Sequence, residues 1–156
     1  MRAMVLVAIV LAGCRGSVSP TTPPSPGTDS AALTRLISAQ MDRAARDWNR
    51  GDLDEFLSDY APESTTTFID GRRARAGIGF IRENYAPRFA TGARRDSLHF
   101  EELKVRGLSP TLALVTARFI LQRGAEVTAS GPFTLVMERQ PEGWKILHDH
   151  SSSDPD

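Results

Sequence analysis

Cysteine is almost missing from this chain. Of its 156 residues only Cys14 is a cysteine, which excludes an internal disulfide and any zinc site built from cysteines. An excess of one charge is missing too, because 19 Lys and Arg residues balance 19 Asp and Glu residues, so no general attraction to nucleic acid is expected. No Gly-rich phosphate loop, serine nucleophile elbow or redox cysteine pair occurs. Any chemistry must therefore come from isolated polar groups.

The N-terminus carries an apolar run that is too short to span a membrane. Residues 4–11 are apolar after the basic Arg2, whereas a helix needs about 20 residues to cross ~30 Å of hydrocarbon. Such a run is typical of a secretory signal peptide. It closes on Leu-Ala-Gly-Cys14, which resembles the bacterial lipobox. This resemblance implies a signal peptide at 1–13, a lipid on Cys14 and export to the cell envelope. A secretory peptide that merely contains Cys14 is the alternative.

Residues 14–29 are predicted to form a tether. Pro, Ser, Thr and Gly dominate this stretch, which has little to bury and favours extended chain. We therefore expect a domain at 30–156 that is held near a membrane by the lipid on Cys14. Arg15 follows the cysteine in place of the aspartate that usually retains such proteins in the inner membrane, which favours the outer membrane of a Gram-negative cell.

The first half of the domain predicts three helices. Leu33, Ile37, Met41, Ala44 and Trp48 recur at helical spacing, so residues 31–49 should bury one face. A second helix should open at residue 52 with a capping box, carry Tyr60 on its apolar face and end at Pro62. Residues 64–70 and 72–76 predict a hairpin around Asp-Gly, and a third helix should follow and end near residue 87.

The second half predicts an antiparallel sheet. Four strand-like runs cover 97–108, 111–122, 128–140 and 143–151, and short turn sequences separate them. Helices followed by a meander of strands indicate an α+β fold. A curled sheet with helices on one side would leave a conical interior.

These segments resemble a known family. The stretches "DWNRGDLDEFLSDY", "TTTFIDG", "LALVTARF", "GPFTLVMER" and "GWKILHDHSS" are similar, in this order, to SnoaL-like domains of the nuclear transport factor 2-like superfamily. The resemblance spans residues 31–152 and is strongest to a bacterial branch of unknown function. It implies an α+β cone with a pocket between sheet and helices, and a homodimer. Its relatives include enzymes, binders and oligomerisation domains, so the fold does not select a function.

His148 and His150 are the candidate catalytic residues. Strict alternation along the last strand places both on the face of Trp144 and Ile146, and Asp149 on the opposite face. Three interpretations stay open. One imidazole acts as a polar anchor or general base in a pocket; the pair binds a metal with a third ligand such as His99; or both are structural. Of these interpretations the metal site is not the one we predict, and no cofactor is expected.

Other candidate pocket residues come from single positions in the predicted helices and strands and not from a motif. Trp48, Phe68 and Tyr85 are candidates for the pocket wall, and Arg118 for binding a ligand carboxylate. The alternative for Arg118 is an outward position or an ion pair with Glu138. The arginine-rich segment at 72–95 would face an anionic partner or form a solvated rim.

The leading hypothesis is therefore an exported, lipid-anchored domain that binds a small, partly apolar molecule. Two alternatives remain: an acid–base enzyme of the isomerase or cyclase type that uses a pocket histidine, and a dimerisation module without a ligand. Neither nucleic acid nor a cofactor is expected as a partner.

Overall fold

The computed structural model describes residues 30–71 and 73–155. The expectations for the signal peptide, Cys14 and the tether fall outside these residues. Within the described part of the chain, no helix is both long and apolar enough to cross a bilayer.

Helix α1 (Ser30–Arg50) forms as the spacing of its apolar residues predicts. Leu33, Ile37 and Trp48 are buried along one side of it, and the other side is charged. The helix ends before Gly51, whose φ of 82° lies in the left-handed region that favours glycine. Gly51 N–H donates to the carbonyl of Trp48 at 3.0 Å, which closes the last turn.

Helix α2 (Leu53–Leu57) is shorter than predicted. Its cap is as expected, since the Asp52 carboxylate accepts the N–H of Glu55 at 3.1 Å. The chain then leaves the helix to pair with the last strand, where Ile146 N–H donates to Asp59 at 2.8 Å and Ile146 accepts from Ala61 at 2.9 Å. Strand-like hydrogen bonds therefore replace the second turn of the helix around Tyr60.

The predicted hairpin and third helix are present. Strands β1 (Thr67–Asp70) and β2 (Arg73–Ala76) pair antiparallel, and Gly77 connects them to α3 (Ile78–Phe89). Strands β3 (Ser97–Gly107), β4 (Leu112–Arg123), β5 (Glu126–Gln140) and β6 (Gly143–Ser151) form the predicted meander. The six strands make one sheet in the order β2-β1-β6-β5-β4-β3. Only β1 and β6 run parallel among these described strands.

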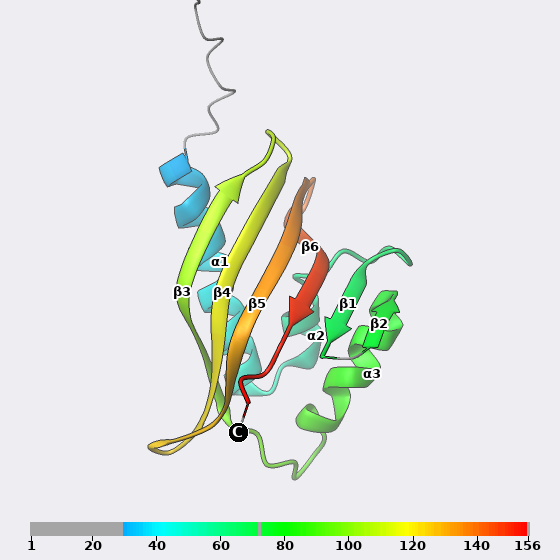
Figure 1. The fold of residues 1–156 in the computed structure, drawn as a ribbon. Helices are drawn as coiled ribbons and strands as arrows, with labels where there is room; N and C mark the ends of the chain where they lie inside the picture. Colours follow the sequence, from blue (N-terminus) through cyan, green and yellow to red (C-terminus); the bar gives the residue numbers. More distant parts are fainter. Residues whose placement is uncertain (1–29, 72, 156) are drawn as a thin grey trace, which may run out of the picture.

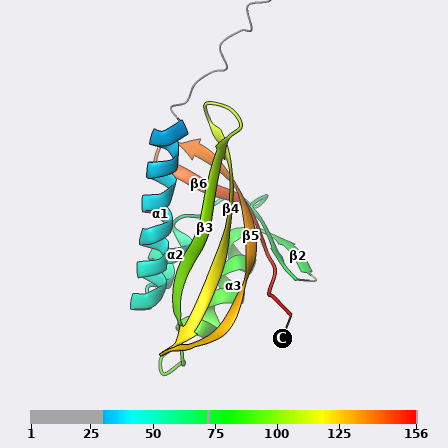
Figure 2. The ribbon, with the colours of Figure 1, turned by 60° about the vertical axis from the view of Figure 1, so that its left-hand side comes forward.

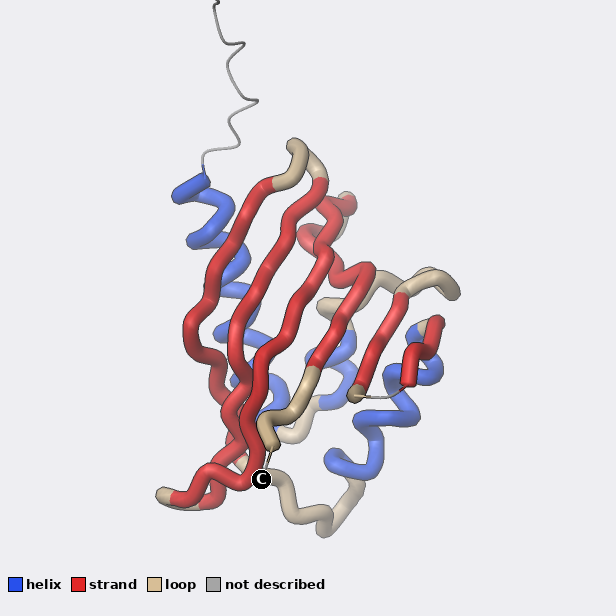
Figure 3. Tube along the Cα trace, in the orientation of Figure 1, coloured by secondary structure: helices blue, strands red, loops and turns tan. Residues whose placement is uncertain are grey.

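The sheet has one covered face. All three helices lie behind it in Figure 1, and the turned view in Figure 2 shows α1 running along β3. We call the helix side, which carries the buried Val115, Leu135 and Met137, the inner face. The opposite, outer face is the one turned to the viewer in Figure 3, where no helix crosses the long strands. The core therefore lies between helices and inner face, and the expected α+β cone is confirmed.

A bulge in β3 helps to shape the interior. Its register against β4 shifts between Glu101 and Lys104, and Glu102 has a φ of 54°. The extra residue keeps Phe100 and Leu103 both packed against the core, although three positions separate them. Bulges increase the bend and twist of a strand, so β3 can follow α1 while the ring of Phe100 faces the interior between the sheet and the helices.

Candidate functional site

A cavity of about 170 Å³ lies between the inner face and the helices. We call it the aromatic pocket, because its wall includes the rings of Trp48, Phe56, Phe68, Tyr85, Phe100 and Phe133. Tyr85 from α3 contacts three of these rings edge-on, at centroid distances of 6.0 Å to Trp48, 5.1 Å to Phe56 and 5.7 Å to Phe68. Such edge-to-face contacts stabilise the pocket wall beyond the contribution of burying the rings.

Asp149 is one of two buried carboxyl groups that line this pocket, and Asp59 is the other. Asp149 is 4% exposed, and its Oδ2 accepts the hydroxyl of Tyr60 at 2.6 Å while Oδ1 accepts the hydroxyl of Ser151 at 2.9 Å. Burial raises the pKa of Asp149 to about 6, and the hydrogen bonds from Tyr60 and Ser151 partly oppose this rise. The carboxyl can therefore both accept and release a proton close to neutral pH.

The two tyrosines beside Asp149 keep their protons. Burial, and then the negative charge of Asp149, raise the pKa of Tyr60 well above its ordinary value. The same two causes raise the pKa of Tyr85. Tyr60 is a hydrogen-bond donor held at Asp149, and it reaches this position because the chain pairs with β6 instead of continuing α2.

A β-bulge brings Asp149 to the inner face. Ile146 pairs with Met137, but His148 pairs with Val136, so Leu147 is an extra residue in β6. Beyond the bulge, Asp149 lies opposite the buried Leu135 and beside Phe68 of β1. One inserted residue reverses the faces of every side chain that follows it in the strand.

The predicted orientation of the two histidines is therefore wrong. His148 and His150 pair with Val136 and Thr134 on the outer face, and neither lines the aromatic pocket. His150 is exposed, and Nδ1 of His148 lies 2.6 Å from Oγ1 of Thr67 on the neighbouring strand. Within the described chain, no group of three or more His, Cys, Asp or Glu residues is placed to hold a metal.

Arg118 lies outside the aromatic pocket. It pairs with Pro132 across the sheet on the outer face, and its guanidinium contacts the carboxylate of Asp154 instead of Glu138. Asp154 also accepts the hydroxyl of Ser130, and both donors lower the pKa of Asp154. This anchor holds the C-terminal segment against β5, so Ser152 and Ser153 close one end of the pocket.

The other expected wall residues lie where the sequence indicates. Trp48, Phe68 and Tyr85 all line the aromatic pocket, and a binding role for them stays a prediction. The indole N–H of Trp48 donates to the carbonyl of Asp96 at 2.9 Å, which fixes its ring. Asp70, Asn84 and Arg88 also line the pocket, although the sequence predicted only a turn at Asp70 and an anionic partner or a solvated rim for the segment that contains Arg88.

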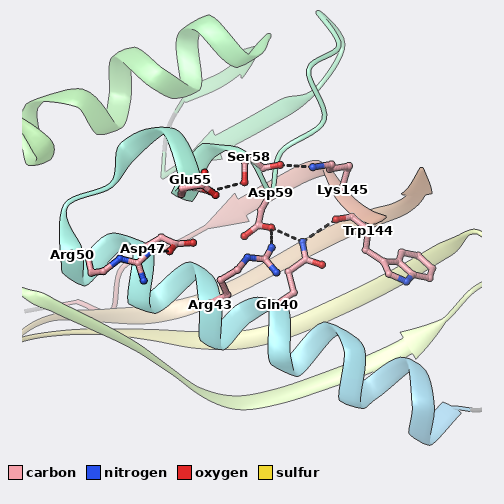
Figure 4. Close-up of polar contacts among 9 residues, drawn as sticks. All are labelled: Gln40, Arg43, Asp47, Arg50, Glu55, Ser58, Asp59, Trp144 and Lys145. Carbon is pink, nitrogen blue, oxygen red and sulfur yellow. Dashed lines mark hydrogen bonds and ion pairs between the residues drawn. The ribbon is translucent and has the colours of Figure 1, made fainter. Parts of the chain in front are cut away.

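A polar network around Asp59, which also lines the pocket, holds Tyr60 in place. Figure 4 shows Gln40 and Arg43 reaching from α1 to Asp59, the residue before Tyr60. The Gln40 amide donates to Asp59 at 2.8 Å and to the carbonyl of Trp144 at 2.9 Å, and Arg43 forms an ion pair with Asp59. Burial raises the pKa of Asp59, against the opposing charge of Arg43. The network joins α1, the segment after α2 and β6 around the tyrosine.

Residues 37–155 match the SnoaL-like domain family. The chain is a member of this family. Its fold is the nuclear transport factor 2-like cone, shared with a protein of unknown function from Shewanella oneidensis at 29% identity, 77% coverage of this chain, 98% of the other and a TM-score of 0.63.

Two solved structures of lower identity share the fold alone. A proposed dehydratase from Streptomyces avermitilis is 19% identical, with 81% of this chain and 99% of the other covered and a TM-score of 0.65. A proposed calcium/calmodulin-dependent protein kinase II association domain from Xanthomonas campestris is 23% identical, with 78% and 88% covered and a TM-score of 0.59. No curated protein matches the chain.

Proposed function

We propose that this SnoaL-like domain binds a small, partly apolar molecule in the aromatic pocket, with Asp149 and Tyr60 as its polar contacts. The observation that carries the proposal is the carboxyl of Asp149, which is 4% exposed in a cavity walled by aromatic rings. Burying an ionisable group is unfavourable unless it is compensated. A core that served stability alone would gain from an apolar side chain at this position.

The volume of the pocket limits the size of the ligand. A cavity of about 150 Å³ accommodates one benzene molecule, and the aromatic pocket measures about 170 Å³. We therefore expect a single ring or a branched chain of similar size inside the pocket. A larger molecule would have to extend through the mouth at Asp70, Asn84 and Arg88.

A second candidate function is acid–base catalysis by Asp149 in place of a histidine. A general base works best when its pKa is near the operating pH, and the pKa of Asp149 is about 6. In an isomerisation, the carboxylate would take a proton from a carbon beside a carbonyl of the ligand and return it to another atom of the same molecule. The likeness in fold to a proposed dehydratase is compatible with such proton transfer.

A cavity-filling variant tests the binding proposal. Leu121 lines the pocket, so Leu121→Trp should fill it, whereas Leu36→Trp makes the same change at a side chain on α1 that is 62% exposed. We expect ligand-detected NMR to show binding of small neutral ring compounds such as benzyl alcohol and cyclohexanone to the wild type and to Leu36→Trp, and loss of binding in Leu121→Trp. Equal signals from both variants would refute the proposal.

Export and lipid attachment at Cys14 are a separate part of the proposed function. The support is the apolar run that ends in Leu-Ala-Gly-Cys14 in the sequence. Metabolic labelling of cells with a palmitate analogue should label the wild-type protein in the membrane fraction and leave Cys14→Ser unlabelled. A labelled Cys14→Ser protein would contradict the assignment.

We further propose that the outer face forms a homodimer interface. Leu112, Leu114 and Val136 lie half-buried on this face, and no helix covers them among the described residues. Sedimentation should show a dimer for the wild type and a monomer for Leu114→Arg. A wild-type monomer at high micromolar concentration would rule the interface out.

A further inference from the structure

The aromatic pocket adjoins a second hollow at its mouth. Phe68, Asp70, Arg73, Arg75 and Asn84 line this hollow, which we call the arginine hollow. Phe68, Asp70 and Asn84 line both cavities. A molecule that fills the aromatic pocket and extends past Asp70 therefore enters the arginine hollow.

Strand register explains why two arginines face this hollow. In the antiparallel pair of β1 and β2, Arg75 lies opposite Phe68 and Arg73 lies opposite Asp70. Directly opposed residues of an antiparallel pair project to the same face. Phe68 points into the aromatic pocket, so both guanidinium groups extend from the exposed edge strand on the same side.

Arg88 adds a third cation at the aromatic pocket. It belongs to α3 and lines the aromatic pocket near Asn84, whose carbonyl it contacts at 3.4 Å. The three guanidinium groups thus come from two elements, β2 and α3, that flank the mouth.

These three arginines differ from five others of the described chain in having no ion pair. Arg43, Arg50, Arg82, Arg118 and Arg123 each form an ion pair with an aspartate. Among the described residues, no carboxylate lies within ion-pair distance of Arg73, Arg75 or Arg88, and Arg75 rests over the ring of Phe80 at 5.7 Å. The mouth therefore offers guanidinium donors that no carboxylate of the described residues holds in an ion pair.

We propose that the ligand of the aromatic pocket is a carboxylic acid whose ring enters the pocket and whose carboxylate binds at Arg73, Arg75 and Arg88. This inference rests on the proposed binding function and names the class of ligand. The planar guanidinium fork matches a carboxylate in a bidentate manner. Asp70 in the same hollow disfavours a dianion such as a phosphate monoester. Asp149 in the aromatic pocket repels an anion when it is ionised, so the carboxylate stays in the arginine hollow and the apolar end of the ligand enters the pocket.

A matched pair of probes tests this assignment in the full chain. The first is 3-phenylpropionate, and the second is its neutral amide, 3-phenylpropanamide, which has the same ring and chain length. Isothermal titration at pH 8 and low salt should show the acid binding about tenfold more tightly, because each exposed ion pair contributes about 1.4- to 5-fold in affinity. High salt should reduce this preference, since exposed charges are screened.

Variants then locate the preference. Arg73→Ala combined with Arg75→Ala should reduce the advantage of the acid to the about 1.4- to 5-fold that Arg88 alone contributes, and leave the affinity of the amide within about twofold. The control is Arg106→Ala combined with Arg139→Ala, which removes two exposed arginines that line neither cavity. This control should keep the preference for the acid.

The two proposals fail in different ways. Equal affinity of the wild type for acid and amide, or an undiminished acid preference in the Arg73/Arg75 double variant, would overturn the carboxylate assignment and leave the pocket proposal intact. Failure of the wild type to bind either probe, or binding that Leu121→Trp does not weaken, would overturn the pocket proposal, and the carboxylate assignment would fall with it.

Discussion

Replacing the buried carboxyl of Asp149 by an amide should make the protein more stable at neutral pH. Asp149→Asn keeps the shape of the side chain and one oxygen that can accept the Tyr60 hydroxyl, now 2.6 Å away. The amide nitrogen would face the hydroxyl of Ser151, which can accept as well as donate. The substitution removes the charge and retains both contacts.

The expected gain follows from the pKa of Asp149. Its folded value is about 6 against an ordinary 3.8, so the folded state binds the proton more tightly than the unfolded chain does. A group with a raised pKa contributes stability that is fully present below the unfolded value and is lost as pH rises through the folded value. At 1.36 kcal/mol per pKa unit, the ionised carboxylate costs ~3 kcal/mol at pH 7, and Asp149→Asn should recover up to that amount.

Urea unfolding at several pH values measures this effect. The difference in free energy of unfolding between Asp149→Asn and wild type should be small at pH 4, grow between pH 4 and about 6, and level off at higher pH. Asp42→Asn is the control, because it removes the same charge from an exposed position on α1 and should change stability by less than about 0.5 kcal/mol. A difference that stays constant from pH 4 to 8, or a variant less stable than wild type at pH 7, would refute the argument from burial.

Four other substitutions have defined outcomes. Tyr60→Phe removes a donor that lowers the pKa of Asp149, so a carboxyl-carbon NMR titration should place that pKa above about 6, with a loss of about 1–3 kcal/mol of stability; an unchanged titration would contradict the hydrogen bond. Gly131→Ala would put a Cβ 1.8 Å from the carbonyl oxygen of Ser152, so urea unfolding should show a loss of about 1–3 kcal/mol in the free energy of unfolding. Gly79→Ala in α3 is the control, because its Cβ meets open space, and it should raise the free energy of unfolding by about 0.5–1 kcal/mol. His150→Ala should leave probe binding within about twofold of wild type, since the imidazole lies outside both cavities, and a larger loss would return the histidine to the site.

Local patterns in the sequence were enough to predict most of the fold. Leu33, Ile37 and Trp48 recur at helical spacing, and amphipathic spacing of this kind specifies which side of a helix is buried whatever it packs against. The last four strands were equally predictable, because alternating residues and turn sequences act over a few positions. Trp48, Phe68 and Tyr85 could be placed in the pocket wall on the same grounds.

The polar part of the site could not be predicted in this way. A strand of nine residues carries no local mark of a bulge, because the extra residue, Leu147, exists only relative to the partner strand. Strict alternation therefore predicts Asp149 on the outer face and the two histidines on the inner face, which is the reverse of what the structure shows. Tyr60 could not be placed from the sequence for a similar reason. Its spacing predicts a helix, but hydrogen bonds between the neighbouring residues and β6 end the helix before it.

The sequence by itself determined the class of fold, the order of the elements and the apolar wall, because these depend on spacing and burial within single segments. Tertiary structure alone decided which charges face the interior. Pairing of β6 with β5 turned Asp149 inward, and pairing of β2 with β1 set Arg73 and Arg75 at the mouth. Register between strands is a relation between distant segments, and one residue of register moves a side chain from solvent to the core.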